Sequence, residues 1–317
     1  MASPMDDREK RLVELKKEVT KRGFNRHASI LGSISDLPIE LRSSALEALA
    51  AGEVVQTVIV FPPQIQRGWH YIPKQALVFT DTGAIHLLAS ILPDQEPQVT
   101  YLRGCGLMYM KITLVLLYGF LEIVAQGQDS PTRLGMEFNT ISWDCLSSPL
   151  RQLLQKTQAV PGLLAGKEGV VGSSTVRQSL ERLPVKFSNG AKIYGVLPGE
   201  ELEEVIFQEA AWKRWLYFFQ RPASANTLLL LTSNYLVVIQ EEVVVKQGWI
   251  LSYIPRGNIA GIQNKPCDCW NELSVQLKRG NQSMDYKLML TSETVETWHS
   301  RWAQHGGFWQ DLPAQQL

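Results

Sequence analysis

The chain contains an internal repeat, in which a pattern of apolar runs and turns between about Gly52 and Leu154 recurs between about Gly199 and Trp302. In both copies a Gly-Glu pair stands before the first apolar run. Further along, matching positions keep a constant offset, which pairs Ile85 with Val237, Leu87 with Ile239, Tyr101 with Tyr253, Leu121 with Leu273, Ile123 with Val275 and Phe138 with Leu290. Because a repeat sets the unit that folds, the sequence predicts a duplicated domain.

The bulk composition fits two globular domains. It also shows no net charge that would attract the molecule as a whole to a highly charged partner. The chain has 317 residues, enough for two cores, and 45% of them are hydrophobic. Its 31 Lys and Arg balance 31 Asp and Glu, so no net charge draws it to nucleic acid, and we expect no nucleic-acid partner. Four cysteines are too few for a disulfide-built fold, and the N-terminus is charged where a signal peptide is apolar. We therefore expect a cytoplasmic protein, with peripheral membrane contact as an open alternative.

Five segments follow from the repeat and from the turn residues that flank it. The N-terminal segment is predicted to form two helices, one over about 6–22 and one that begins near Pro38. Gly162, Gly166, Gly169 and Gly172 mark a linker between the copies. The predicted segments are residues 1–50 (helical), 51–157 (first domain), 158–192 (Gly-rich linker with a short helix), 193–307 (second domain) and 308–317 (tail).

Each copy reads as a series of antiparallel strands that ends in one helix. In the second copy, two apolar runs, 228–231 and 235–239, flank the turn Thr232-Ser233-Asn234, as in a hairpin. Its closing helix has Val295, Trp298 and Trp302 on one face, with Thr291 or Ser292 as the cap. In the first copy we expect the closing helix to open at Ser147 or Ser148, before Pro149. The fold class is therefore α+β and mainly antiparallel β.

About a hundred residues of successive antiparallel strands, closed by an amphipathic helix with Trp on its inner face, resemble the pleckstrin-homology-like (PH-like) superfold. The resemblance is nearest to bacterial PH-like and GRAM-like modules, through the segment Leu228–Ile239 and the following Tyr253-Ile254-Pro255. It implies two tandem bent sheets or barrels, each plugged by its C-terminal helix. It also implies binding rather than catalysis, since such folds bind peptides on the sheet edge beside the C-terminal helix and lipids on loops.

The same resemblance points to a basic and aromatic hairpin near the start of each copy. Clustered Lys and Arg make charge-assisted bonds to phosphate, and aromatic rings suit a membrane interface. The alternative is a hairpin whose rings seal a domain end. The usual basic spacing of phosphoinositide-binding members is absent. The candidate ligand-binding residues are Trp212, Lys213, Arg214, Trp215 and Arg221 in the second copy and Arg67, Trp69 and Lys74 in the first.

Known catalytic strings are missing from the sequence. Residues 162–168 resemble a phosphate-binding loop but are one residue short, and Glu168 stands where Ser or Thr must bind magnesium. There is no G-x-S-x-G elbow and no H-E-x-x-H string. Cys267 and Cys269 lack a second cysteine pair that would complete a zinc site. We therefore predict no metal, no cofactor and no enzymatic activity.

The sequence thus predicts a non-enzymatic binding or scaffold protein that recognises a protein or peptide partner. Two alternatives stay open. One is peripheral binding to an anionic membrane through the basic-aromatic hairpins. The other is an enzyme whose site is assembled only by the fold.

Overall fold

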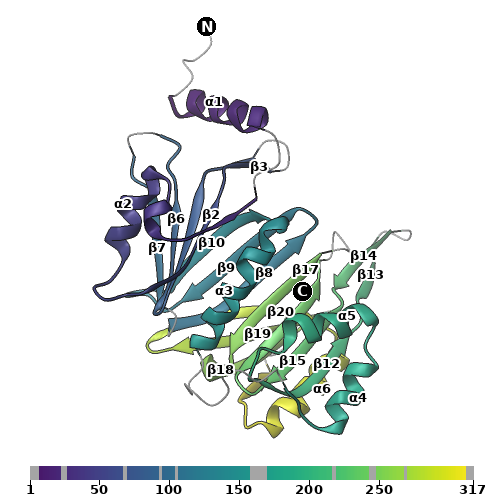
Figure 1. The fold of residues 1–317 in the computed structure, drawn as a ribbon. Coiled ribbons are helices and arrows are strands. Elements are labelled where there is room, and N and C mark those ends of the chain that lie inside the picture. The colour runs from purple at the N-terminus through teal and green to yellow at the C-terminus, as the bar shows by residue number, and fades with distance from the viewer. Residues whose placement is uncertain are drawn as a thin grey trace. The chain divides into compact units, whose positions relative to one another are not determined.

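The computed structural model shows an α+β fold with mainly antiparallel sheets (Figure 1), as the strand patterns predict. It describes residues 7–22, 27–66, 70–92, 95–103, 106–157, 170–215, 219–242, 248–267 and 270–311. Among the described strands, none of the sheets closes into a barrel, so the barrel form of the prediction is not found.

The chain forms two compact units, which we describe separately. The first contains residues 1–105, 117–120 and 132–157, and the second contains 106–116, 121–131 and 158–317. Strand β9 (Tyr118–Ala125) is divided between the two.

The first unit is built on one five-stranded sheet in the order β1-β2-β5-β6-β7. Its neighbouring strands are antiparallel. A separate two-stranded hairpin, β3-β4, lies between β2 and β5 in the chain. The elements are α1 (Asp7–Arg22), β1 (Ser29–Leu31), α2 (Ile39–Ala48), β2 (Val55–Phe61), β3 (Gln64–Gln66), β4 (His70–Ile72), β5 (Gln75–Thr80), β6 (Gly83–Leu88), β7 (Gln98–Arg103), β10 (Thr132–Asn139) and α3 (Trp143–Lys156).

Helix α2 packs against the five-stranded sheet, and the two together form one hydrophobic core of this unit. It lies beside β6 and β7 (Figure 1), and Leu41 and Ala45 on its inner face are fully buried. They pack against Val58, Val78 and Ile85 of the sheet. All six residues of β5 are buried, as expected for a strand in the centre of a sheet. The interior thus fixes both the sheet register and the place of α2.

The second unit contains two antiparallel sheets joined by a short chain segment. One includes β8-β17-β16-β15-β12-β11, and the other has the order β20-β19-β18-β21. Among the described strand pairs of these sheets, only β11–β12 and β18–β21 are parallel. The elements are β8 (Leu107–Val115), β11 (Val170–Val171), α4 (Ser174–Glu181), α5 (Val185–Gly190), β12 (Glu201–Gln208), β13 (Ala211–Trp215), β14 (Phe219–Ser224), β15 (Thr227–Thr232), β16 (Tyr235–Glu241), β17 (Trp249–Pro255), β18 (Ile259–Pro266), β19 (Asn271–Arg279), β20 (Gln282–Leu290), α6 (Ser292–Gln304) and β21 (Trp309–Asp311).

Helix α6 closes the core of the second unit. Its Val295, Trp298 and Trp302 are buried on one face, which confirms the predicted stripe. The side chain of Thr291 accepts a hydrogen bond from the Thr294 backbone and so caps the helix, as predicted. Together the two tryptophans form an edge-to-face pair with ring centroids 6.5 Å apart. Such a pair buries a large apolar area and holds α6 firmly on the sheets.

The Gly-Glu pair has the same local structure in both units: a glycine with positive φ is followed by a glutamate that accepts several hydrogen bonds. Gly52 and Gly199 have φ values of 81° and 86°, which favour glycine. The following Glu53 accepts hydrogen bonds from the hydroxyls of Thr80, Thr82 and Tyr101. Glu200 accepts them from Thr232 at the end of β15 and from Ser233 and Asn234 in the turn after it. The order of elements also recurs, since in each half a hairpin follows the first strand, three antiparallel meander strands and three further strands come next, and a helix ends the series.

Candidate functional site

The predicted basic-aromatic hairpin of the second copy exists as β13 and β14. Its register places Lys213 opposite Arg221, Arg214 opposite Gln220 and Trp215 opposite Phe219. Trp212 is 49% exposed. The side chains of Lys213, Arg214, Trp215 and Arg221 lie outside the described part of the structure. The structure therefore brings the predicted basic positions together along the backbone and leaves their ligand role as a prediction.

In the first copy only Lys74 can be placed, because Arg67 and Trp69 lie outside the described residues. The Lys74 ammonium forms an ion pair with Glu40 at the start of α2. Burial is the largest single influence and would raise the pKa of Glu40, but the hydrogen bond and charge of Lys74, together with a backbone hydrogen bond, lower that pKa overall. Lys74 thus already has an anionic partner within the chain.

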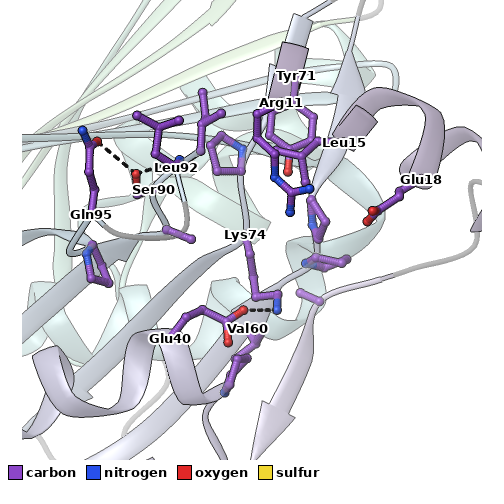
Figure 2. A pocket seen from close by; sticks show the side chains of 18 of the residues that line it. Arg11, Leu15, Glu18, Glu40, Val60, Tyr71, Lys74, Ser90, Leu92 and Gln95 are labelled. Atoms are coloured by element: carbon purple, nitrogen blue, oxygen red, sulfur yellow. Dashed lines mark hydrogen bonds and ion pairs between the residues drawn. The ribbon is translucent and has the colours of Figure 1, made fainter. Parts of the chain in front are cut away.

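Lys74 and Glu40 form part of a cleft of about 910 Å³ in the first unit (Figure 2). Arg11, Leu15 and Glu18 of α1 line one side, and Tyr71 lies beside Arg11. Burial raises the pKa of the Tyr71 hydroxyl. Much of the remaining wall is proline and aliphatic, from Pro38, Val60, Pro62, Pro63, Pro73, Ala89, Ile91, Leu92 and Pro97.

A smaller cleft of about 400 Å³ lies at the corresponding place in the second unit, between the start of α5 and the ends of β12 and β16. Here the helix supplies the cation, because Lys186 pairs with Glu241. The Lys186 ammonium also lies 4.5 Å from the centre of the Trp249 ring. The two clefts therefore carry ion pairs of opposite polarity at the start of their helices.

The most specific arrangement is found at the edge of β18 that is not paired with β19, beside α6. Strand β21 from the C-terminal segment pairs there in parallel, with Trp309 opposite Ile262, Gln310 opposite Gln263 and Asp311 opposite Asn264. The Ile262 amide donates to the carbonyl of Phe308 at 3.1 Å. We call residues 308–311 the C-terminal strap.

Side chains hold the strap at both ends. The Trp309 ring stacks on His299 with centroids 4.7 Å apart, and it meets Trp298 edge-on at 6.3 Å. The Asp311 carboxylate accepts hydrogen bonds from Nδ2 of Asn264 at 3.0 Å and from the Trp309 indole at 3.1 Å. These two bonds lower the pKa of Asp311, with Asn264 as the larger cause. The edge thus offers an aromatic contact and, two residues further on, a polar contact.

Two glycines allow the chain to turn from α6 onto this edge. Gly306 has a φ of 74°, and a Cβ on Gly307 would lie 1.8 Å from Nε1 of Trp302. Gly261 of β18 similarly makes room for the Phe308 ring, since its Cβ would lie 2.8 Å from that ring. The sequence prediction treats 308–317 as a tail and misses the strap. Gly306-Gly307 followed by Phe308-Trp309 is the signal that marks it.

Comparisons with known proteins add no assignment. No model of a known protein family matches the chain, and no curated protein is significantly similar to it.

Within the described ranges, no three His, Cys, Asp or Glu side chains are grouped so that they could hold a metal ion. None of the described helices has both the length and the apolar character needed to cross a membrane.

Proposed function

We propose that this protein is a non-enzymatic binding or scaffold protein of two tandem PH-like domains, and that it recognises an extended peptide segment of a partner protein along β18. One observation carries the proposal: the edge already binds a peptide, namely the chain's own strap. An edge strand presents unpaired backbone groups that favour strand addition, and pockets for side chains give selectivity.

The strap is short enough to be exchanged. It contributes three strand residues at the end of the described range, so its release disturbs no described element that follows it. Phe308 is 61% exposed and Trp309 is only partly buried. A tethered segment competes with an external ligand at an effective concentration in the millimolar range. Exchange therefore needs a partner with better contacts than the strap makes.

The test uses a synthetic peptide with the sequence of residues 306–312 and the full-length chain. In the Trp309→Ala variant the strap loses its ring contacts, and we expect the labelled peptide to bind about fivefold more tightly than to the unmodified chain, which corresponds to about 1 kcal/mol of strap stability. Trp212→Ala is the matched control, because it removes an exposed tryptophan elsewhere in the second unit. Fluorescence anisotropy that shows no binding to any of the three proteins would refute the proposal.

A second candidate function, binding to an anionic membrane, rests on the β13-β14 hairpin. Lys213 stands opposite Arg221 in register, and the neighbouring Trp212 is half-exposed. Such a hairpin would bind vesicles in a salt-sensitive way. The test is pelleting with phosphatidylserine vesicles, in which Lys213→Glu with Arg214→Glu should abolish binding. The exposed pair Lys192→Glu with Lys278→Glu makes the same change in charge and should retain it.

A further inference from the structure

At the Asp311 end of the strap, only one of the two polar atoms in the Asn264 side chain has a hydrogen-bond partner among the described residues. Asn264 is 8% exposed, and its amide Nδ2 donates to Asp311. Among the residues that the structure describes, its buried Oδ1 atom has no hydrogen-bond partner. A buried acceptor without a donor is unfavourable, because it has lost its bonds to water. The strap therefore fits the donor of Asn264 and leaves the acceptor unmatched.

The strap cannot correct this mismatch with its own side chain. At the position opposite Asn264 it carries Asp311, whose ionised carboxylate only accepts hydrogen bonds. The lowered pKa of that carboxyl group keeps it ionised at neutral pH. A primary amide, by contrast, offers one acceptor and two donors. An asparagine at this position can receive the Nδ2 bond and return one to Oδ1, so that both atoms of Asn264 are paired.

We infer that the preferred ligand of the β18 edge is an extended segment with an aromatic residue followed two positions later by an asparagine, and that the strap is a weaker self-ligand that such a segment displaces. This inference rests on the proposed function. The aromatic side chain takes the place of Trp309 on His299 and Trp298. The amide takes the place of Asp311 and pairs with Asn264. The segment runs parallel to Ile262–Asn264, as the strap does.

The strap also explains how selectivity arises without a deep pocket. Each external segment must compete with a ligand that is already tethered in place, so a segment with only backbone complementarity gains nothing by exchange. A hydrogen bond to Oδ1 of Asn264 adds binding free energy that the strap does not provide. The orphaned acceptor thus converts a general strand-binding edge into one that distinguishes an amide from a carboxylate.

The test compares two peptides that differ in a single group. Acetyl-Gly-Phe-Trp-Gln-Asn-Leu-amide and its Asp counterpart are titrated into the full-length Trp309→Ala protein, with fluorescence anisotropy as the readout. We expect the Asn peptide to bind about tenfold more tightly, as one additional satisfied buried acceptor predicts. In the Asn264→Ala background this preference should disappear. In the control Gln263→Ala, which loses only an exposed side-chain bond to Gln310, it should persist.

The outcomes separate the inference from the proposed function. If both peptides bind and the Asp peptide binds equally well or better, the amide preference is wrong and the peptide-binding edge stands. If neither peptide binds to Trp309→Ala, the proposed function fails and the inference fails with it. If Asn264→Ala does not fold, Asp311→Asn in the otherwise unmodified chain replaces it. That substitution should protect the Ile262 amide from hydrogen exchange about tenfold better, and unchanged protection would overturn the inference.

Discussion

The Gly307→Ala substitution is expected to open the strap while the rest of the second unit stays folded. The new Cβ would lie 1.8 Å from Nε1, 2.1 Å from Cε2 and 2.4 Å from Cδ1 of Trp302. These distances are far below van der Waals contact, so either the indole or the strap must move. Trp302 is 6% exposed and packs edge-on against Trp298, whereas the strap is held by one short strand. The strap is therefore the part that moves.

The magnitude follows from what holds the strap. Its backbone bond to Ile262 and its side-chain bonds to Asn264 and Gln263 contribute about 1 kcal/mol each. The two ring contacts of Trp309 add about 1 kcal/mol each. Ordering four backbone residues costs about 4 kcal/mol. The closed strap is thus favoured by about 1 kcal/mol, and an overpacking cost of about 1–3 kcal/mol is enough to reverse the equilibrium.

Hydrogen exchange and thermal unfolding measure the two parts of this expectation. In Gly307→Ala the Ile262 amide should lose its protection and Trp309 should become accessible to acrylamide quenching. The unfolding free energy should fall by no more than about 1 kcal/mol, because the open state relieves the clash. Gly257→Ala is the matched control, since its Cβ would meet nothing within 4 Å. Retained Ile262 protection together with a loss of more than about 3 kcal/mol would show that the core yields instead.

Three further predictions concern carboxylates. Because two hydrogen bonds lower the pKa of Asp311, the ionised form stabilises the closed strap; this contribution is complete above the ordinary value of 3.8 and is lost as the pH falls through the lowered pKa. Quenching of Trp309 should show this opening, and Asp311→Asn should abolish it. Glu200→Ala should lower the unfolding free energy by about 3 kcal/mol in denaturant titrations, because it removes the acceptor of four donors, whereas the exposed neighbour Glu201→Ala should change it by less than about 0.5 kcal/mol. Burial would raise the pKa of Glu53, but hydrogen bonds from Thr80, Thr82, the Ala50 backbone and Tyr101 together lower it to about 2. The first unit should therefore lose stability as the pH falls from 4.5 toward 2, and circular dichroism should show no such step in Glu53→Gln.

The strands and the closing helix of the second copy could be predicted because their signals are local. Two continuous apolar runs on either side of Thr232-Ser233-Asn234 predict a hairpin, and the stripe of Val295, Trp298 and Trp302 predicts burial of one helix face. Helix α3 shows the limit of local signals. Its predicted start before Pro149 is wrong, because the helix begins at Trp143 and Pro149 lies inside it. A proline after two serines is typical of a first helical turn, but Pro149 is buried inside the helix.

The strap and the clefts depend on which distant segments meet, and residue types alone do not specify this. Parallel pairing of Trp309 with Ile262 joins residues that are far apart in the chain. Nothing in the local pattern of Asn264 reveals that its amide will be buried beside Asp311. The Gly306-Gly307 pair predicts the end of a helix. That the chain then passes against Trp302 depends on how the core packs, which the local sequence does not specify.

The repeated order of elements also indicates why exchange is favoured at β18 in particular. By its place in that order, β8 is the counterpart of β18. The edge of β8 is paired with β17 over five residues, from Trp249 opposite Leu114 to Tyr253 opposite Met110. Releasing such an edge would break a continuous sheet and expose buried residues such as Ile112. At β18 the covering segment has only three residues and lies at the end of the described chain, so its release costs little and leaves the other strands of both sheets in the second unit paired.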